Sequence, residues 1–249
     1  MSVTTAMVLA AGKGTRMRPL TDRMAKAMIP VAGQPLIDHA LSRVAAAGIA
    51  QAVVNLHAHA DGLQAHLAAR AAPPAIRVSD ERDALLETGG GVLAALPMLG
   101  DGPFVTLNGD AIWAGPEPIV NLLHAWSKAR AATEALMLLV PRHRAHGYTR
   151  PGDFFLDAEL GPPRRRGDAE VAPFVFTGAQ VMRPSAFDGL AEMGIAGPHG
   201  RPAFSLNPVW DALAARGTLA AVIWEGDWVD VGTPDGIPVA EALLAQYHG

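Results

Sequence analysis

Residues 9–20 read LAAGKGTRMRPL, and they overlap the end of a short apolar stretch, TTAMVLA, at 4–10. An apolar stretch that soon reaches a glycine is typical of a buried parallel strand that leads into a loop. Small residues after such a strand let backbone N–H groups approach a phosphate closely. Gly12 and Gly14 tolerate a positive φ, so consecutive amides can point into one concavity. The segment therefore predicts a phosphate-binding loop at the end of the first strand of an α/β sheet.

The positively charged residues of this segment support phosphate binding, and the motifs that it lacks exclude two common classes of phosphate-binding loop. Lys13, Arg16 and Arg18 bring positive charge, and the Arg16 guanidinium can hold two phosphate oxygens at once. The dinucleotide-binding fingerprint would need a third glycine where Met17 stands, and no G-x-x-x-x-G-K-[ST] string occurs. A bare G-x-G is most often a tight turn, so the interpretation depends on the residues that follow it.

Further along the chain, stretches typical of strands and helices alternate. Strands are expected at 52–56, 76–79, 104–107 and 135–140, and helices at 35–47, 60–69, 91–96 and 119–131. This alternation predicts a three-layer, Rossmann-like α/β sandwich with a mostly parallel central sheet, which binds ligands beyond the carboxyl ends of its strands. Beyond residue 141 the pattern is less regular, with strands expected at 174–181 and 219–223 and helices at 208–215 and 235–246.

Composition excludes several classes of function. The 249 residues carry 20 Lys and Arg against 24 Asp and Glu, a net charge of -4, and no cysteine. An acidic balance argues against nucleic acid as a partner, because covering a duplex needs a basic face. Without cysteine there are no disulfides, thiolate metal sites or cysteine nucleophiles. A basic, apolar leader and a run of about 20 apolar residues are both absent, so we expect a soluble cytoplasmic protein without a membrane partner.

Two blocks follow the loop, KAMIPV at 26–31 and GQPLI at 33–37. With residues 9–21 they make the sequence resemble the sugar-1-phosphate nucleotidylyltransferases (NDP-sugar pyrophosphorylases). The signature of that family is an apolar strand, then L-A-A-G-x-G-T-R-x-x-P-L-T, then a lysine in K-x-x-x-P-V. Five blocks between Leu9 and Gly232 fit in order, so the resemblance covers nearly the whole chain.

The resemblance implies transfer of a nucleoside monophosphate from a nucleoside triphosphate to a sugar 1-phosphate, with release of pyrophosphate. The attacking phosphate is already ionised at neutral pH, so we expect positioning and charge neutralisation to carry the catalysis. The fold implied is that of the nucleotide-diphospho-sugar transferases, in one domain over 1–249. Its nucleotide-binding half lies at about 1–110 and its sugar-binding half at about 111–249. Arg16 and Lys26 are implied as the catalytic cations on the phosphates.

Two aspartates match the metal ligands of the family. Asp110 follows the apolar stretch 104–107, and Asp230 lies in the short run WVDV at 228–231. Mg²⁺ favours one or two carboxylates together with phosphate oxygens and water. A lone aspartate at a strand end is more often a turn former or a helix cap. Because the glycine loop is also present, we expect Asp110 and Asp230 to bind Mg²⁺, the expected cofactor.

Residues 87–91, ETGGG, correspond to the family segment near the nucleobase, and 176–178, FTG, to a strand near the sugar. Glu87 or Glu81 could accept a hydrogen bond from a base N–H; the alternative for the glycines is a flexible helix start. We expect the nucleotide to contact Leu9, Ala10, Ala11, Gly12, Lys13, Gly14, Thr15, Glu81, Thr88 and Gly89. We expect the sugar substrate to contact Asn108, Glu87, Thr177 and Gly178.

The chain departs from the family in one cation. Many relatives hold the sugar phosphate with a second lysine, but residues 141–173 contain no lysine. Arg142, Arg144, Arg150 or the run 164–166 could replace it electrostatically, although a planar guanidinium does not mimic an ammonium.

The blocks 87–91, 176–178 and 228–233 make the chain most like family members that join UTP to N-acetylmuramate α-1-phosphate in bacterial cell-wall recycling. The alternatives within the family are mannose-1-phosphate guanylyltransferase and glucose-1-phosphate uridylyl- or thymidylyltransferase activity. From other classes, a non-catalytic nucleotide-sugar binding protein is disfavoured by the metal carboxylates, and an NAD-dependent oxidoreductase by Met17. The sequence leaves the oligomeric state open.

Overall fold

The structure, a computed structural model, describes residues 2–189 and 202–247. Its central sheet contains four parallel strands in the order β6, β1, β4, β5. Their bounds are Phe104–Asn108 for β6, Thr5–Leu9 for β1, Gln51–Leu56 for β4 and Ala75–Asp80 for β5. Because parallel strands end at the same edge of a sheet, the glycine loop after β1 lies beside the ends of β4 and β6.

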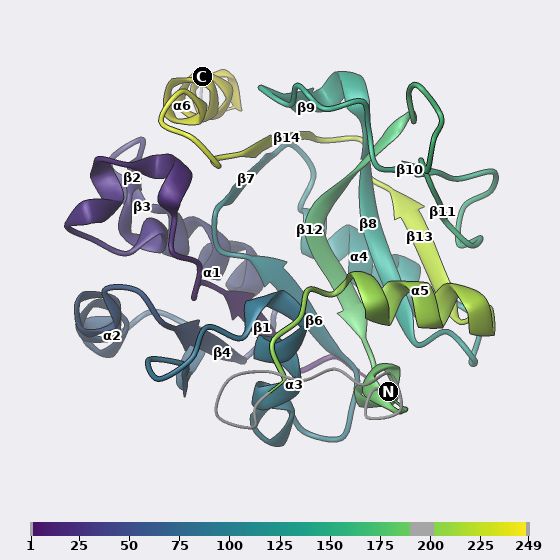
Figure 1. Cartoon of the computed structure of the whole chain (residues 1–249), viewed down its shortest axis with the longest axis horizontal. Coiled ribbons are helices and arrows are strands. Elements are labelled where there is room, and N and C mark those ends of the chain that lie inside the picture. The colour runs from purple at the N-terminus through teal and green to yellow at the C-terminus, as the bar shows by residue number, and fades with distance from the viewer. Residues whose placement is uncertain (1, 190–201, 248–249) are drawn as a thin grey trace.

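Strand β12 (Phe174–Met182) joins this part of the sheet to a second part. It runs antiparallel to β6 and to β8 (Ala135–Pro141), and β8 pairs in parallel with β13 (Leu219–Ile223). A hairpin of β10 (Phe154–Phe155) and β11 (Arg164–Arg165) extends the sheet beyond β12 (Figure 1). The sheet is thus mixed: its core strands are mostly parallel, as predicted, and the antiparallel β12 is what the alternation did not predict.

Helices cover both faces of the sheet. One hydrophobic cluster packs α1 (Leu36–Ala46), α2 (Ala60–Ala69) and α4 (Pro118–Lys128) against one face. A second cluster packs α3 (Glu87–Leu99) and α5 (Asn207–Arg216) against the other. Ala6 and Val8 of β1 belong to the first cluster and Met7 to the second, because successive strand side chains point to opposite faces. The predicted three-layer α/β sandwich is confirmed.

A small second sheet brings together residues that are far apart in the sequence. Its strands, in spatial order, are β7 (Ala111–Ala114), β14 (Asp227–Asp230) and β9 (Ala145–His146). Helix α6 (Gly236–Tyr247) packs against β7 and β14 through a third hydrophobic cluster. Since β7 directly follows Asp110 and β14 ends at Asp230, this sheet places the two predicted metal ligands on adjacent strands.

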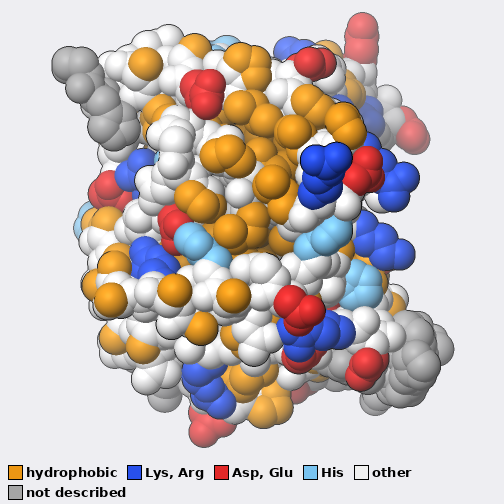
Figure 2. Space-filling model, turned by 90° about the vertical axis from the view of Figure 1, so that its left-hand side faces the viewer, with side chains coloured by type: hydrophobic (Ala, Val, Ile, Leu, Met, Phe, Trp, Pro, Cys, Tyr) orange, Lys and Arg blue, Asp and Glu red, His pale blue; other side chains and the backbone are white. Residues whose placement is uncertain are grey.

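Short elements follow the glycine loop. They are the 3₁₀ turns η1 (Thr15–Met17), η2 (Leu20–Asp22) and η3 (Lys26–Met28), and the hairpin of β2 (Pro30–Val31) and β3 (Gln34–Pro35). Figure 2 shows the face on which this hairpin, α6 and α2 lie. Hydrophobic side chains gather over its upper and central part, and positive and negative side chains are mixed around them. This face therefore offers no continuous basic surface.

The start of α3 differs from the sequence prediction. The periodicity predicted a helix at 91–96, but α3 begins earlier, at Glu87, and includes the glycines. The N–H groups of Gly89 and Gly90 donate to the carbonyl of Phe204, at 2.8 and 3.1 Å. A segment distant in the sequence thus completes the helix start, which a local pattern cannot reveal. Within residues 2–189 and 202–247, no helix has the length and apolar character needed to cross a membrane.

Candidate active site

The glycine loop turns at Gly14. Gly14 has φ +61°, and a Cβ there would lie 2.8 Å from Thr21 Cγ2. The Gly14 carbonyl accepts hydrogen bonds from the Thr21 hydroxyl and from the Met17 N–H, both at 2.8 Å. Gly12 does not have a positive φ, and a Cβ there would meet nothing within 4 Å. The backbone conformation therefore requires glycine at position 14. At position 12 the backbone does not require glycine, and the absence of a side chain leaves the space beside the loop open.

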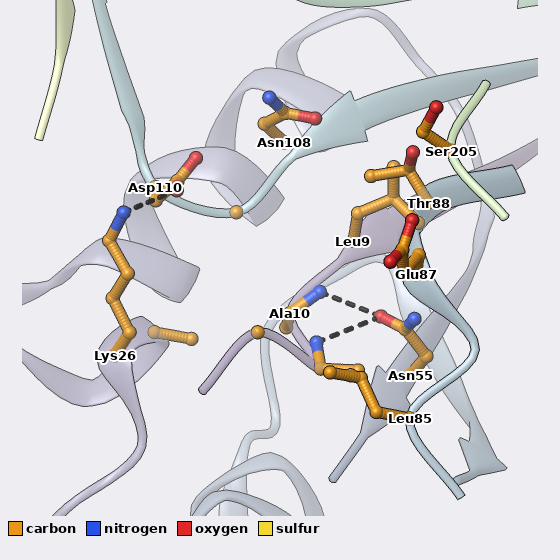
Figure 3. Close-up of a pocket in the computed structure, with 14 residues that line it drawn as sticks. Leu9, Ala10, Lys26, Asn55, Leu85, Glu87, Thr88, Asn108, Asp110 and Ser205 are labelled. Carbon is orange, nitrogen blue, oxygen red and sulfur yellow. Dashed lines mark hydrogen bonds and ion pairs between the residues drawn. The ribbon is translucent and has the colours of Figure 1, made fainter. Parts of the chain in front are cut away.

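A buried polar pair anchors the first residues of the loop. Asn55 Oδ1 accepts the N–H groups of Ala10 and Ala11, at 2.7 and 3.2 Å (Figure 3). Asn55 Nδ2 donates to Glu81 Oε1 at 2.8 Å, and Glu81 Oε2 accepts the Leu86 N–H at 3.4 Å. Glu81 is 0% exposed, so its carboxylate lies behind the loop and not against a nucleobase as expected. The amides of Ala10 and Ala11 donate to Asn55 in the same network.

Sequence analysis missed Asn55, although a signal for it existed. It is the polar residue in the otherwise apolar strand stretch AVVNL at 52–56. A polar side chain in a buried strand must find hydrogen-bond partners inside the protein. Such a residue at the end of β4, beside the loop, is a natural anchor for the loop backbone.

The loop borders a pocket of about 350 Å³, here called the loop pocket. It lies between the loop, the end of β6 and the start of α3, and the predicted site residues that line it are Leu9, Ala10, Ala11, Gly12, Lys26, Glu87, Thr88, Asn108 and Asp110. Figure 3 shows Lys26 and Asp110 at one end and Glu87, Thr88 and Ser205 at the other. Glu87 has φ +59°, a strained conformation that tends to occur at functional sites. Of the residues that the structure describes, Lys26 is the only cation that lines the pocket, and it lies at the end opposite Glu87.

Lys26 and Asp110 form an ion pair at that end. Lys26 Nζ lies 2.6 Å from Asp110 Oδ2, and the side chain of Lys26 is only 11% exposed. Asp110 is fixed by its neighbours in the chain, because the N–H of Gly109 donates to the carbonyl of Leu9 at 2.9 Å. The ends of β1 and β6 thus hold this carboxylate beside the loop.

Asp230 and Arg16 reach the same place from other directions. Asp230 opposes Ala111 in the β14–β7 ladder, and the Val231 N–H donates to the Asp110 carbonyl at 3.0 Å. A Cβ on Gly232 would lie 3.1 Å from Asp230 Oδ2 and 3.3 Å from Arg16 Nη2. The two charged groups therefore meet at Gly232.

The charged neighbours of Asp230 act on its carboxylate in opposite directions. Burial, and then the negative charge of Asp110, raise the pKa of Asp230 above its ordinary value. The positive charges of Lys26, Arg16 and Arg150 act in the opposite direction. Two carboxylates and three cations thus share one electrostatic environment. Four of these five groups are the catalytic and metal residues expected from the sequence.

A second pocket, of about 420 Å³, adjoins the first and is here called the polar pocket. Asn108 lines both pockets, and Asp230 lines the polar one. Of the arginines that could replace the missing lysine, Arg150, Arg165 and Arg166 line it, while Arg142, Arg144 and Arg164 do not. Aromatic walls come from Phe154, Phe176, Trp210 and Trp228.

Thr177 and Gly178 lie outside both pockets. Thr177 is 0% exposed, and its hydroxyl donates to the Leu138 carbonyl at 2.9 Å, so the expectation that it contacts sugar is wrong for the side chain. Its carbonyl accepts the indole N–H of Trp228 at 2.8 Å. Gly178 has φ +84°, and a Cβ there would lie 2.8 Å from Asn108 Cγ. Gly178 therefore makes room for Asn108, while Thr177 holds Trp228 in the pocket wall.

Besides Glu81, five other expected residues do not line either pocket: Lys13, Gly14, Thr15, Gly89, and Arg16, which lies beside Asp230 at Gly232. Gly89 packs against the ring of Phe204, 2.5 Å from where its Cβ would be, so it supports the start of α3. Lys13 and Thr15 are exposed, and Gly14 is half-buried in the turn of the loop. The pockets thus use the strand end and the beginning of the loop, up to Gly12.

Comparison with known proteins agrees with this site. The sequence model of the nucleotidyl transferase family matches residues 5–150. N-acetylmuramate alpha-1-phosphate uridylyltransferase from Caulobacter vibrioides is 44% identical over 247 residues, which cover 97% of each chain. The protein of the same name from Neisseria meningitidis serogroup B is 33% identical over 247 residues, 97% of this chain and 99% of the other.

A solved structure shows the same fold. Apo UDP-glucose pyrophosphorylase superposes with a TM-score of 0.77 at 16% identity, over 99% of this chain and 100% of the other. Family match, full-length relatives and fold all agree with the resemblance first seen in the glycine loop. The chain belongs to the nucleotidyl transferase family, as an enzyme of the sugar-1-phosphate nucleotidylyltransferase group.

Proposed function

We propose that this enzyme transfers UMP from UTP to N-acetylmuramate α-1-phosphate, giving UDP-N-acetylmuramate and pyrophosphate. Two relatives that align over nearly the whole chain bear the name of this activity. The observation that carries the proposal is the convergence of Lys26, Arg16, Asp110 and Asp230 where the two pockets adjoin. UTP then occupies the loop pocket and the sugar occupies the polar pocket, with the reacting phosphates between them.

The chemistry asks for positioning and charge neutralisation. An oxygen of the sugar phosphate forms a bond to the α-phosphorus of UTP, and the bond from that phosphorus to the oxygen bridging the β-phosphate breaks. The pyrophosphate leaves with the electron pair, and no proton has to be removed from the nucleophile. Lys26 and Arg16 hold phosphate oxygens through charge-assisted hydrogen bonds and keep the two reacting groups in line.

Mg²⁺ fits the pair Asp110 and Asp230. Asp230 ends β14, and Asp110 immediately precedes the adjacent strand β7. Burial together with the Asp110 charge raises the pKa of Asp230, as expected where a cation is needed to offset two acids. Among the described residues no group of three His, Cys, Asp or Glu side chains could hold a metal alone, so substrate phosphate oxygens and water would complete the coordination. When bound, the ion neutralises phosphate charge and orients the reacting groups.

The other end of the loop pocket is assigned to the nucleoside. Glu87, Thr88 and Ser205 lie there, away from Lys26 (Figure 3). Carboxylate and hydroxyl groups suit the N–H of a uracil ring and the hydroxyls of ribose. Leu9 and Leu85 also line this pocket and offer apolar contact to a flat base.

Arg150 is assigned the role that the second lysine has in relatives, contact with the sugar phosphate. It lines the polar pocket, and its charge lowers the pKa of Asp230, so it lies near the reacting centre. Its guanidinium lies 4.8 Å from the centre of the Tyr148 ring. No carboxylate of residues 2–189 or 202–247 forms an ion pair with it, so its charge is available to a phosphate.

The two halves proposed from the sequence then have separate tasks. Residues of about 1–110 supply most of the pocket assigned to UTP, with Ser205 from the second half, and residues of about 111–249 supply most of the pocket assigned to the sugar, with Asn108 from the first. UTP is a cytoplasmic nucleotide and N-acetylmuramate is a sugar of the bacterial cell wall. We therefore place the enzyme in the cytoplasm, where it would return this sugar to peptidoglycan synthesis.

A substrate panel tests the proposal. Pyrophosphate release is measured with each of UTP, GTP, CTP, ATP and dTTP against N-acetylmuramate, N-acetylglucosamine, glucose and mannose 1-phosphates, with MgCl₂. The expected result is that UTP with N-acetylmuramate α-1-phosphate gives the highest kcat/KM. Turnover confined to GTP and mannose 1-phosphate, or to dTTP or UTP with glucose 1-phosphate, would replace the proposed substrates by those of another family member.

A further inference from the structure

The three arginines of the polar pocket differ in what neutralises them. Arg165 Nε lies 2.6 Å from Asp211 Oδ1, and its Nη2 contacts Asn207 at 3.2 Å. Arg166 donates to the Ala169 carbonyl at 2.6 Å through Nη1. In the part of the chain that the structure describes, no carboxylate lies within 4 Å of the Arg166 guanidinium. Arg165 is thus internally paired, whereas Arg166 keeps an uncompensated charge.

Asp153, which also lines the polar pocket, is already occupied by other donors. Asp153 Oδ1 accepts the Tyr148 hydroxyl at 2.8 Å, and Asp153 Oδ2 accepts the Phe176 N–H at 3.1 Å. Burial, and then the hydrogen bond to Asp153, raise the pKa of Tyr148 to about 12. The hydroxyl therefore stays protonated at neutral pH and keeps donating to Asp153.

The backbone fixes the position of Arg166 at one side of the polar pocket. Its N–H donates to the Asp153 carbonyl at 2.8 Å, next to the β10–β11 hairpin. Asp230, at the end of β14, lines the same pocket. Among the arginines of this pocket, it is Arg150 whose positive charge lowers the pKa of Asp230. The two unpaired guanidinium groups thus enter the pocket from different segments.

A half-buried guanidinium without a counter-charge is stabilised when an anion reaches it. Its planar fork matches the geometry of a carboxylate, which it can hold with two parallel hydrogen bonds. The sugar phosphate is already assigned to Arg150, near the reacting centre. A second, separate cation in the sugar pocket therefore suits a second anionic group on the sugar.

We infer that Arg166 binds a carboxylate of the sugar substrate, so that the polar pocket selects sugar 1-phosphates that also carry an acid. The inference deepens the proposed function and rests on it. N-acetylmuramate is N-acetylglucosamine with an added lactic acid ether, and the carboxylate of that ether is the second anion. Arg166 is then a specificity-determining residue that acts away from the reacting phosphorus.

A substrate pair that differs only in this ether tests the inference. The kcat/KM values of N-acetylmuramate and N-acetylglucosamine α-1-phosphates are measured with UTP and MgCl₂, and their ratio is the readout. Arg166→Gln should lower the ratio roughly 10- to 100-fold, the usual loss for one hydrogen-bonded charge pair. Arg166→Lys, which keeps the charge without the fork, should restore part of the ratio.

Arg164→Gln is the matched control. Arg164 lies on the same hairpin and loses the same charge, but it is exposed and does not line the pocket, so the ratio should stay at the wild-type value. A ratio within twofold of wild type in folded Arg166→Gln would overturn the inference. A loss seen with Arg150→Gln alone would also overturn it, because the carboxylate would then belong to Arg150.

A chemical control covers the case in which Arg166→Gln does not fold. Wild-type enzyme is given N-acetylmuramate α-1-phosphate whose lactic acid group has been converted to the amide, which removes the charge and keeps the shape. The amide should be used 10- to 100-fold less well than the acid. Equal use of the acid and the amide would overturn the inference.

Failure of the proposed function can be told apart from failure of this inference. Glucuronate and glucose 1-phosphates form a second pair that differs by a carboxylate. If the wild type prefers the acidic member of this pair and ignores N-acetylmuramate, the proposed substrate is wrong and the acid site stands. If it prefers the acidic member of neither pair, the inference is wrong, whichever sugar is used.

Discussion

The loop pocket and the polar pocket are built in different ways. The loop pocket is walled by strand ends and by a backbone that the buried Asn55 side chain holds in place. The polar pocket is lined by long side chains, of which Arg165 and Arg166 extend from a short hairpin at the margin of the sheet. Preorganised backbone suits the UTP proposed for the loop pocket, whereas exchangeable side chains suit the sugar proposed for the polar pocket. On this proposal, the residues that carry catalysis and the residues that select the sugar can be changed separately.

The largest expected effect is at the junction of the two pockets. Asp110→Asn removes a carboxylate that both pockets depend on, so kcat should fall by roughly 10³-fold or more with every substrate. Stopped assays of pyrophosphate release measure this, and circular dichroism checks the fold. Asp101→Asn, on a loop outside both pockets, is the control and should behave as wild type. A near-normal rate for Asp110→Asn would contradict the metal assignment.

Arg150→Gln should affect the sugar side more than the nucleotide side. Loss of one charge-assisted contact to the sugar phosphate should raise the KM for the sugar 1-phosphate roughly 10- to 100-fold. The KM for UTP should change much less. Arg77→Gln, an exposed arginine on β5, controls for the change in net charge. If the KM for UTP rose as much as the KM for the sugar, the division between the two pockets would not hold at Arg150.

Asn55→Ala should destabilise the backbone that forms the loop pocket. The substitution leaves the amides of Ala10 and Ala11 without their acceptor and the buried Glu81 carboxylate without one donor, which should lower the free energy of unfolding by about 2–4 kcal/mol. Urea unfolding measures this loss, and KM for UTP should rise. Gln51→Ala, at the exposed start of the same strand, should change stability far less. Equal stability of the two variants would show that the network does not anchor the loop.

The smallest expected effect is on the melting temperature, which should depend on pH and on Mg²⁺ through Asp230. Because the pKa of Asp230 is raised in the folded protein, the folded state holds a proton there at a pH where the unfolded state has lost it. The contribution of Asp230 to the free energy of unfolding is therefore favourable at low pH and is lost as the pH rises through its raised pKa. In EDTA, Asp230→Asn should therefore melt higher than wild type at pH 7.5, and the difference should shrink at pH 4.

Mg²⁺ provides the second half of that experiment. Excess MgCl₂ should raise the Tm of wild type at pH 7.5 through binding to the folded state, and should raise that of Asp230→Asn less. Asp235→Asn, at an exposed position near the same strand, is the control and should respond like wild type. Identical melting of all three proteins in EDTA and in MgCl₂ would contradict both the pKa direction and the metal site.

Local patterns predicted the parallel half of the sheet well, because buried parallel strands are short apolar runs between helices. They did not predict β12 as the antiparallel link between β6 and β8, since strand direction depends on pairing that an apolar run does not encode. The early start of α3 was missed for a similar reason. Its first turn is completed by Phe204, far along the chain.

The sequence indicated well which charged residues would come together. It was less successful with polar residues that support another side chain instead of facing a pocket. Lys26, Asp110 and Asp230 were expected, and the fold brings them together. Glu81 and Thr177 were expected to touch ligands, but both are buried and serve Asn55 and the Trp228 wall. A sequence shows that a polar residue is present at a strand end, but the rotation of its side chain depends on packing.

The pairing of β7 with β14 has a consequence for protein synthesis. Asp110 is added to the growing chain 120 residues before Asp230, and the pairing of β7 with β14 brings the two together. The nucleotide side also needs late residues, because Phe204 completes the start of α3 and Ser205 lines the loop pocket. A translation product that stops before β14 would therefore lack the second acid of the proposed metal pair.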